Sequence, residues 1–189
     1  MIGILPQALE VGGKMLPIRT DFRDVLNLFP MFDDKELSDL EKAYICCRNL
    51  YKCDIDVDYF DEAVDKIYWF IDGGDIPKDE PAPVRILDWE KDERTLMPAI
   101  SKTVGVPDVR SLPYMHWWTF LGAFGEMGEG LYSTILNMRR KLADGEKLDE
   151  WERKWIQKNK DLVVIHTKEE EEAIAETEAF LKDLLKDDY

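Results

Sequence analysis

Apolar residues along the chain recur mostly at steps of three and four positions, the spacing of amphipathic α-helices. The first eighteen residues differ, because two short apolar arms, 8–11 and 14–18, flank Gly12-Gly13, and paired glycines supply the positive φ angles of a hairpin turn. The pattern predicts a mainly α fold: a multi-helix bundle with a small N-terminal β-hairpin and an acidic C-terminal helix. The expected helices run from Thr20 to Pro30, from Asp33 or Asp34 to about Lys52, from Asp58 to Gly73-Gly74, from Asp88 to Gly105, from Pro113 to Gly125, from Leu131 to Leu142, from Lys147 to about Val164, and from Lys168 to Lys186.

The apolar spacing also predicts which face of each helix is buried. The second helix should bury one apolar face, formed by Leu37, Leu40, Tyr44, Cys47 and Tyr51. The helix expected over 147–164 should bury the face formed by Leu148, Trp151, Trp155 and Leu162. Arg139-Arg140-Lys141, at the end of the helix expected over 131–142, suits the negative end of a helix dipole. His116, which lies beside two tryptophans, is expected to be a hydrogen-bonded interior histidine.

The chain is expected to form a helical domain over residues 1–165, which includes the hairpin at about 8–18 and a Pro-rich linker at about 73–85. Residues 166–189 form a separate part, an acidic C-terminal helix. Thr167 and Glu170 match a capping box at its start. Its thin apolar stripe leaves three arrangements open: docking on the same chain, pairing with another copy, or no contact.

The composition indicates a folded protein with a strongly acidic exterior. Hydrophobic residues make up 45% of the chain, enough for a core, while 40 acids against 25 bases give a net charge of −15. Nucleic-acid binders and peripheral membrane proteins need basic clusters, so neither nucleic acid nor membrane is an expected partner. The three cysteines, Cys46, Cys47 and Cys53, together with an N-terminus that lacks a secretory signal, favour free thiols and a cytoplasmic location.

Motifs of catalysis are missing from the sequence. It contains no nucleophile elbow and no Walker loop, and the glycines at 125, 128 and 130 lack the flanking strand and lysine of a phosphate site. Neither His116 nor His166 has the Glu-x-x-His spacing of a di-iron bundle. Paired carboxylates for hydrolysis stay open, but with 40 acids any spacing occurs by chance. We therefore expect no enzymatic activity, no cofactor and no metal site.

Four local motifs, in this order, carry a family resemblance. They are Thr20-Asp21-Phe22-Arg23, Asp88-Trp89-Glu90-Lys91-Asp92, the run from Leu112 through His116-Trp117-Trp118 to Phe120, and Met138-Arg139. Over about Leu9 to Arg140 the chain resembles the bacteriophage gene-product-fifteen family of long-tailed phages that infect Gram-positive bacteria. The resemblance implies a tail-assembly chaperone in the cytoplasm of the infected host. Such a protein binds the tape measure protein and the tail tube protein, and no catalytic residue is associated with the role.

A chaperone for an amphipathic helical client needs an apolar groove. Some of five tryptophans are the candidate groove residues: Trp89, Trp117, Trp118, Trp151 and Trp155. The alternative is that all five belong to the core. Two other functions stay open, a structural tail or connector component retained in the virion and an acidic DNA mimic that inhibits a host enzyme. Homo-oligomerisation is also left open.

Overall fold

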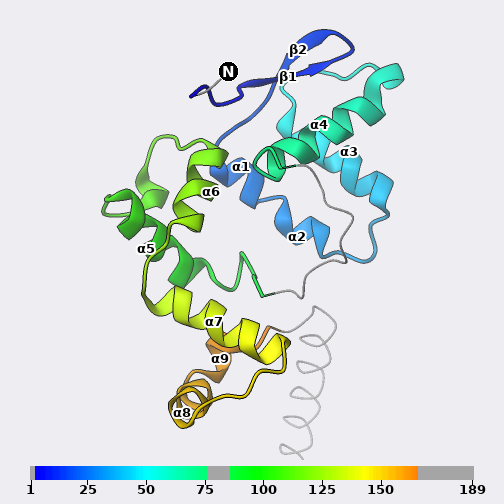
Figure 1. Cartoon of the computed structure of the whole chain (residues 1–189). Coiled ribbons are helices and arrows are strands. Elements are labelled where there is room, and N and C mark those ends of the chain that lie inside the picture. Colours follow the sequence, from blue (N-terminus) through cyan, green and yellow to red (C-terminus); the bar gives the residue numbers. More distant parts are fainter. Residues whose placement is uncertain (1–2, 76–85, 166–189) are drawn as a thin grey trace, which may run out of the picture. The chain divides into compact units, whose positions relative to one another are not determined.

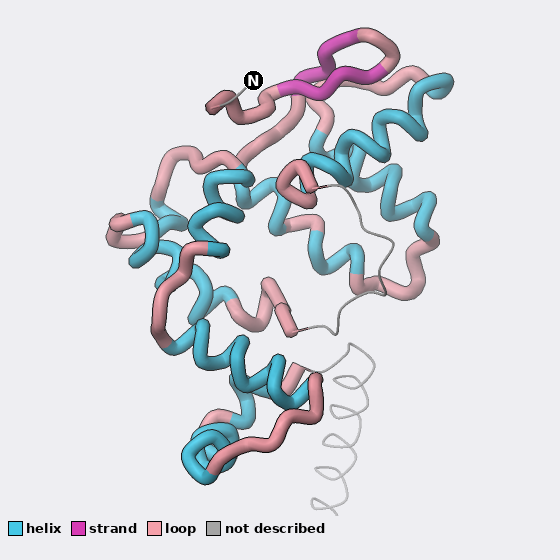
Figure 2. Tube along the Cα trace, in the orientation of Figure 1, coloured by secondary structure: helices cyan, strands magenta, loops and turns pink. Residues whose placement is uncertain are grey.

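The computed structural model of the chain describes residues 3–75 and 86–165. Most of the predicted Pro-rich linker and all of the predicted acidic C-terminal helix, including Thr167, lie outside the described residues. Within them the predicted fold class is confirmed, since helices dominate and one two-stranded antiparallel sheet lies near the N-terminus (Figure 1; Figure 2).

Contacts within the chain define two compact units. Of the described residues, unit 1 comprises 3–75 and 89–133, and unit 2 comprises 86–88 and 134–165.

The predicted hairpin is present. Strands β1 (Ala8–Val11) and β2 (Lys14–Pro17) pair antiparallel, with Ala8 opposite Pro17 and Val11 opposite Lys14. Gly12 and Gly13 form the turn with φ angles of 56° and 72°, which glycine adopts without a Cβ penalty. Because Leu9 and Val11 are buried and β1 lies against α4, the hairpin is anchored to the helices of unit 1.

The first predicted helix is divided into two. Helix α1 (Phe22–Leu26) is capped by Asp21, not by Thr20, and it ends before Pro30 is reached. Pro30 lies in the first turn of a second short helix, α2 (Phe29–Phe32), where a missing N–H costs no hydrogen bond. The prediction that Pro30 ends the first helix is therefore wrong.

Helix α3 (Asp39–Leu50) begins later than the sequence predicted. Ser38 caps it and forms a reciprocal capping box with Glu41, an arrangement that neither Asp33 nor Asp34 makes. Its buried face is formed by Ala43, Cys46, Cys47 and Leu50, whereas Leu40 and Tyr44 of the predicted inward stripe are exposed. The small side chains of this face suit a close approach, and α3 packs against α4.

Helix α4 (Phe60–Ile71) follows a short 3₁₀ turn, η1 (Val57–Tyr59). Asp56 caps η1, so the predicted cap at Asp58 is wrong by two residues. The end of α4 is confirmed: Gly73 and Gly74 both have positive φ, and the Gly74 N–H donates to the Trp69 carbonyl at 2.9 Å.

The rest of unit 1 contains α5 (Glu93–Val104), η2 (Val109–Ser111) and α6 (Trp117–Gly125). Residues 89–92 form turns, so α5 begins five residues after the predicted Asp88. Pro98 is exposed inside α5 without ending it, and Gly105 caps its C-terminus at φ 77°. Helix α6 begins at Trp117 because His116 caps it, which makes the predicted start at Pro113 wrong.

Unit 2 contains most of α7 (Leu131–Ala143), which agrees with its predicted span, followed by α8 (Glu150–Lys158) and α9 (Lys160–Val163). The sequence predicted one helix over 147–164, but the helix is interrupted at Asn159, which ends α8 and precedes α9. Asp149 caps α8 and forms a capping box with Glu152. Trp151, predicted to face inward, is exposed, whereas the Trp155 side chain is half-buried.

Arg139 has a different role from the one its sequence position indicated. The side chain is only 4% exposed, and its guanidinium donates to the carbonyls of Val163 (3.1 Å), Leu162 (2.6 Å) and Ile86 (3.1 Å). Two of these carbonyls are at the C-terminus of α9, where helix carbonyls lack partners of their own. Arg139 therefore joins three segments of unit 2, whereas its neighbour Arg140 is exposed.

Candidate functional site

A half-open groove in unit 1 is the candidate functional site. It has a volume of about 540 Å³ and is formed by α1, α2, α5, η2 and the turn at residues 89–90. The apolar lining residues are Phe22, Leu26, Pro30, Trp89 and Met97, and the polar ones are Arg23, Asn27, Glu90, Glu93 and Arg110. Phe22 and Met97 are buried, whereas most of the polar side chains are exposed, so the groove has an apolar floor and a charged rim.

Arg23 fixes the α1 side of the groove. Its Nε lies 2.7 Å from Asp21 Oδ1, and its Nη atoms donate to three backbone carbonyls within residues 110–113. Asp21 also accepts backbone N–H groups of Arg23 and Met115. Burial disfavours the ionised carboxylate, but the hydrogen bonds from Arg23 and Met115 outweigh it and hold the pKa of Asp21 below its ordinary value. Helix α1 is thereby tied to the segment that carries Arg110.

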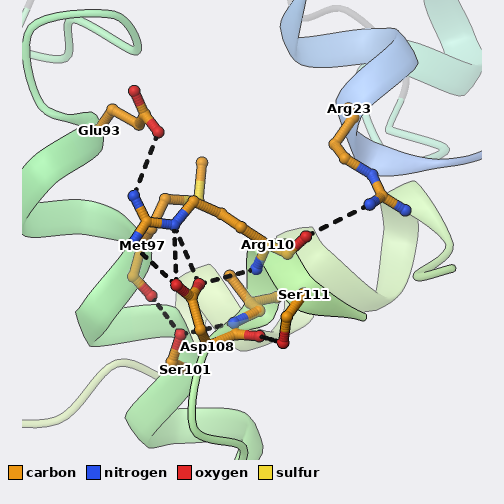
Figure 3. Close-up of polar contacts among 8 residues, drawn as sticks. Arg23, Glu93, Met97, Ser101, Asp108, Arg110 and Ser111 are labelled. Atoms are coloured by element: carbon orange, nitrogen blue, oxygen red, sulfur yellow. Dashed lines mark hydrogen bonds and ion pairs between the residues drawn. The ribbon is translucent and has the colours of Figure 1, made fainter. Parts of the chain in front are cut away.

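Arg110 fixes the α5 side of the groove, where Figure 3 shows it between two carboxylates. Its Nη2 lies 2.9 Å from Asp108 Oδ2 and its Nη1 lies 3.4 Å from Glu93 Oε1. Hydrogen bonds from Arg110 lower the pKa of Asp108. Beneath this pair, the buried Ser101 hydroxyl accepts the Val109 N–H at 2.8 Å and donates to a carbonyl of α5, which holds η2 against α5.

An aromatic cluster supports the groove from below. Trp89 is half-buried, and its ring centroid lies near four other rings: Phe29 (5.1 Å), Phe124 (5.5 Å), Trp117 (6.3 Å) and Phe120 (6.4 Å). Trp117 is fully buried, and its Nε1 donates to the Ile71 carbonyl at 2.7 Å. Because Trp89 rests on packed rings and also lines the groove, its position is set by the core.

The five tryptophans singled out in the sequence lie in three separate places. Trp89 lines the groove and Trp117 lies beneath it, so these two are brought together. Trp118 packs elsewhere in unit 1, with its ring 5.2 Å from Trp69 and its Nε1 bonded to the Phe70 carbonyl. Trp151 and Trp155 are neighbours on α8 in unit 2, with ring centroids 6.4 Å apart.

Most other groove residues were not identified as site residues from the sequence. Phe22 was named only within the Thr20–Arg23 motif, and Leu26, Met97 and Arg110 were given no role. A signal for some of them was present, because two of the motifs that carry the family resemblance, Thr20–Arg23 and Asp88–Asp92, both contribute lining residues.

The histidine and the two adjacent cysteines, which are the reactive side-chain types in this region of the sequence, have structural roles. His116 is buried; its Nδ1 accepts the Trp118 N–H at 3.0 Å, and its Nε2 lies 2.9 Å from the Pro6 carbonyl, which confirms the predicted interior histidine. Burial raises the pKa of Cys46 to about 12 and that of Cys47 to about 11, so both thiols stay protonated. Across residues 3–75 and 86–165, no three His, Cys, Asp or Glu residues are grouped to hold a metal ion.

A second cavity of about 640 Å³ lies in unit 1 between α5 and residues 126–133. It is lined by Pro98, Met127 and Leu131 among charged and hydroxyl side chains, and its one aromatic lining residue, Tyr132, is buried. We take the first groove as the candidate site because aromatic and Arg side chains are enriched where proteins bind. None of the helices in the described ranges has the length and apolarity needed to span a membrane.

The fold and the groove define a class: a mainly α-helical protein with an N-terminal hairpin and an aromatic-floored surface groove. Residues 1–165 match the family described as Bacteriophage Gp15 protein, and the chain belongs to that family. Membership indicates a structural or assembly role in a bacteriophage. Searches of curated proteins and of solved structures gave no match.

Proposed function

We propose that this protein is a non-enzymatic tail-assembly chaperone that works in the cytoplasm of the infected bacterium. Its clients are the tape measure protein and the tail tube protein. The observation that supports the proposal best is the groove of unit 1, whose floor contains Trp89 and whose rim is charged.

The groove is suited to an amphipathic helix of a client. Leu26, Pro30 and Trp89 offer apolar surface to the buried side of such a helix, while Glu90 and Arg110 can pair with its polar flanks. The Arg23 and Arg110 hydrogen-bond networks hold the walls in place before binding, which reduces the ordering cost of association.

The net charge of −15 supports the same role. A chaperone must keep an aggregation-prone client dispersed, and like-charged complexes repel one another in solution. Because the groove is a local apolar surface within unit 1 of a strongly acidic chain, client binding and solubility do not conflict.

The experiment is co-expression of the chain with the tape measure protein of the same phage, followed by affinity purification. Asn27 is an exposed lining residue, so Asn27→Trp should fill the groove and reduce co-purified tape measure protein about tenfold. Lys14→Trp is the matched control, because Lys14 is exposed on β2, outside the groove. Thermal unfolding of both variants checks the fold, and equal recovery by two folded variants would refute the groove assignment.

A structural tail component is the competing role, and purified virions distinguish the two. A chaperone should be absent or scarce in the particles by quantitative mass spectrometry. A fixed number of copies per tail would replace the chaperone proposal with a structural role.

A further inference from the structure

The outer edge of strand β1 in unit 1 has unpaired backbone groups. The Ile18 N–H donates to the Gln7 carbonyl at 3.0 Å, so in this antiparallel ladder every second residue from Gln7 onward bonds to β2. The N–H and C=O groups of Ala8 and Glu10 therefore point away from β2. In the part of the chain that the structure describes, these four groups have no hydrogen-bond partner.

Both ends of the same edge are covered by side chains of the protein itself. At the turn, the Gly12 N–H donates to Glu62 Oε2 at 2.9 Å. At the N-terminal end, the Pro6 carbonyl lies 2.9 Å from His116 Nε2. An exposed strand edge is a template for pairing with another strand. Here the template is restricted to the short stretch between the two covered ends.

A groove of about 480 Å³ adjoins this open stretch. It is lined mainly by residues of β1 and α4, two elements that are in contact (Figure 1). Ala8 and Glu10 are among its lining residues, and Trp69 of α4, which is half-buried, contributes apolar surface. The open backbone groups thus lie beside a surface on which the side chains of an added strand can pack.

The charge of the groove is negative. Its charged lining consists of three acids and one base: Glu10, Glu62, Asp65 and Lys66. None of the four forms an ion pair with another described residue. Lys14, the base of the hairpin, lies opposite Val11 at the turn and does not line the groove. A complementary occupant therefore carries positive charge.

We propose that this groove binds an extended, basic segment of another protein, which adds to β1 as a third strand. The backbone of that segment bonds the open groups of Ala8 and Glu10, and its Lys or Arg side chains pair with Glu62 and Asp65. In strand addition, main-chain hydrogen bonds supply affinity and the alternating side chains supply specificity. The site shares no lining residue with the client groove, so the inference is independent of the proposed function.

A second copy of β1 fits this edge poorly. Pairing of two such edges would bring Glu10 and the acids of α4 from both copies against one another. Like charges opposed across a strand pair are destabilising. The occupant is therefore a basic strand and not the same strand of another copy.

Fluorescence anisotropy with a short labelled peptide of alternating valine and lysine tests the proposal on the full chain. A salt concentration of about 0.15 M NaCl limits long-range attraction to the acidic protein. Ala8→Pro removes an outward N–H without changing the charge, and proline is tolerated at the first residue of an edge strand. This variant should bind the peptide about tenfold more weakly. Ala8→Val is the matched control, because it adds a side chain of similar size and keeps the N–H.

Asp65→Lys tests the charge of the groove with the same peptide. Asp65 is exposed on α4, so the variant should fold and should bind the peptide about fivefold more weakly. Glu36→Lys makes the same change of charge at an exposed position outside the groove and should bind like the wild type. Equal losses in the two variants would show general attraction to an acidic chain and would overturn the assignment of this site.

Hydrogen exchange of the wild type, resolved by NMR, gives a result that depends on no variant. At saturating peptide, the amides of Ala8 and Glu10 should exchange about tenfold more slowly, while Leu9, already bonded within the hairpin, should change little. Three outcomes would overturn the proposal: no binding to the wild type, equal binding by the proline and valine variants, or unprotected amides at Ala8 and Glu10. Protection that rises with protein concentration in the absence of peptide would assign the edge to a second copy instead.

Discussion

Two arginines of this chain act by bonding to backbone carbonyls rather than as surface cations. Arg23 combines its pairing to Asp21 with three carbonyls in the segment 110–113, and Arg139 bonds three carbonyls in unit 2. The planar guanidinium, with five donors in fixed directions, makes this possible, and a lysine ammonium could not reproduce it. At the scale of single residues, these groups determine which loops lie against which helices.

Asp21→Asn tests the charge in the Asp21–Arg23 pair. Asn keeps an acceptor for the N-terminus of α1, so the variant should lose only the ionic part of the interaction with Arg23. The expected loss is about 1–2 kcal/mol of unfolding free energy at pH 7. The pKa of Asp21 in the folded chain lies below its ordinary 3.8, so its contribution is complete above pH 3.8 and is lost as the pH falls through the lowered value. Urea unfolding from pH 7 to pH 3 should show the two proteins converging; a constant difference would contradict the assignment.

At the scale of elements, caps and turns determine where helices and strands begin and end. The hairpin depends on Gly12 and Gly13, which both have positive φ, but their surroundings differ. A Cβ on Gly12 would lie 2.8 Å from a ring carbon of Tyr59, whereas a Cβ on Gly13 would meet no atom within 4 Å. The turn is therefore fixed by backbone conformation at both positions and by packing at one.

Gly12→Ala and Gly13→Ala separate these two effects. Gly13→Ala should cost about 1 kcal/mol through backbone strain alone, and Gly12→Ala should cost about 1–2 kcal/mol more because of the clash. Chemical unfolding of both variants measures the difference. Tyr59→Ala in the Gly12→Ala background should remove the excess, and a double-mutant cycle without coupling would show that the clash is relieved in another way.

At the scale of the whole molecule, the chain forms two compact units with separate polar anchors. Unit 1 has the Asp21–Arg23 and Asp108–Arg110 pairs, whereas unit 2 depends on Arg139 and on the Lys141–Glu152 ion pair. Compact units of this kind open by local unfolding with their own free energies. A substitution inside one unit should therefore affect that unit most.

Arg139→Met should destabilise unit 2 selectively. The change leaves three carbonyls without the guanidinium, at an expected cost of about 3 kcal/mol. Hydrogen exchange followed by mass spectrometry should show amides of α8 and α9 exchanging about a hundredfold faster, with α3 and α4 little changed. Arg140→Met, at the exposed neighbouring position, should leave exchange unchanged. Equal acceleration in α3 and α4 would show that the units unfold together.

Much of the fold could be predicted from the sequence, because helix periodicity and turn residues act over a few neighbouring positions. Gly12-Gly13 indicated the hairpin turn, Gly73-Gly74 indicated the end of α4, and the order of four local motifs indicated the Bacteriophage Gp15 family. Of the candidate site, only Trp89 and its support Trp117 were identified. The groove joins residues 22–30, 89–97 and 110, and no pattern along the chain records their proximity.

What the sequence by itself determined was the helical class, the hairpin, the acidic exterior and the family, since periodicity, turn chemistry and charge are local properties. Only the tertiary structure decided that Leu40 and Tyr44 of α3 are exposed, that Trp151 is exposed, and that Arg139 bonds carbonyls from distant segments. The physical reason is that burial depends on which element packs against a face. On α3, long-range packing buries Ala43 and Cys46 and leaves the larger Leu40 and Tyr44 exposed.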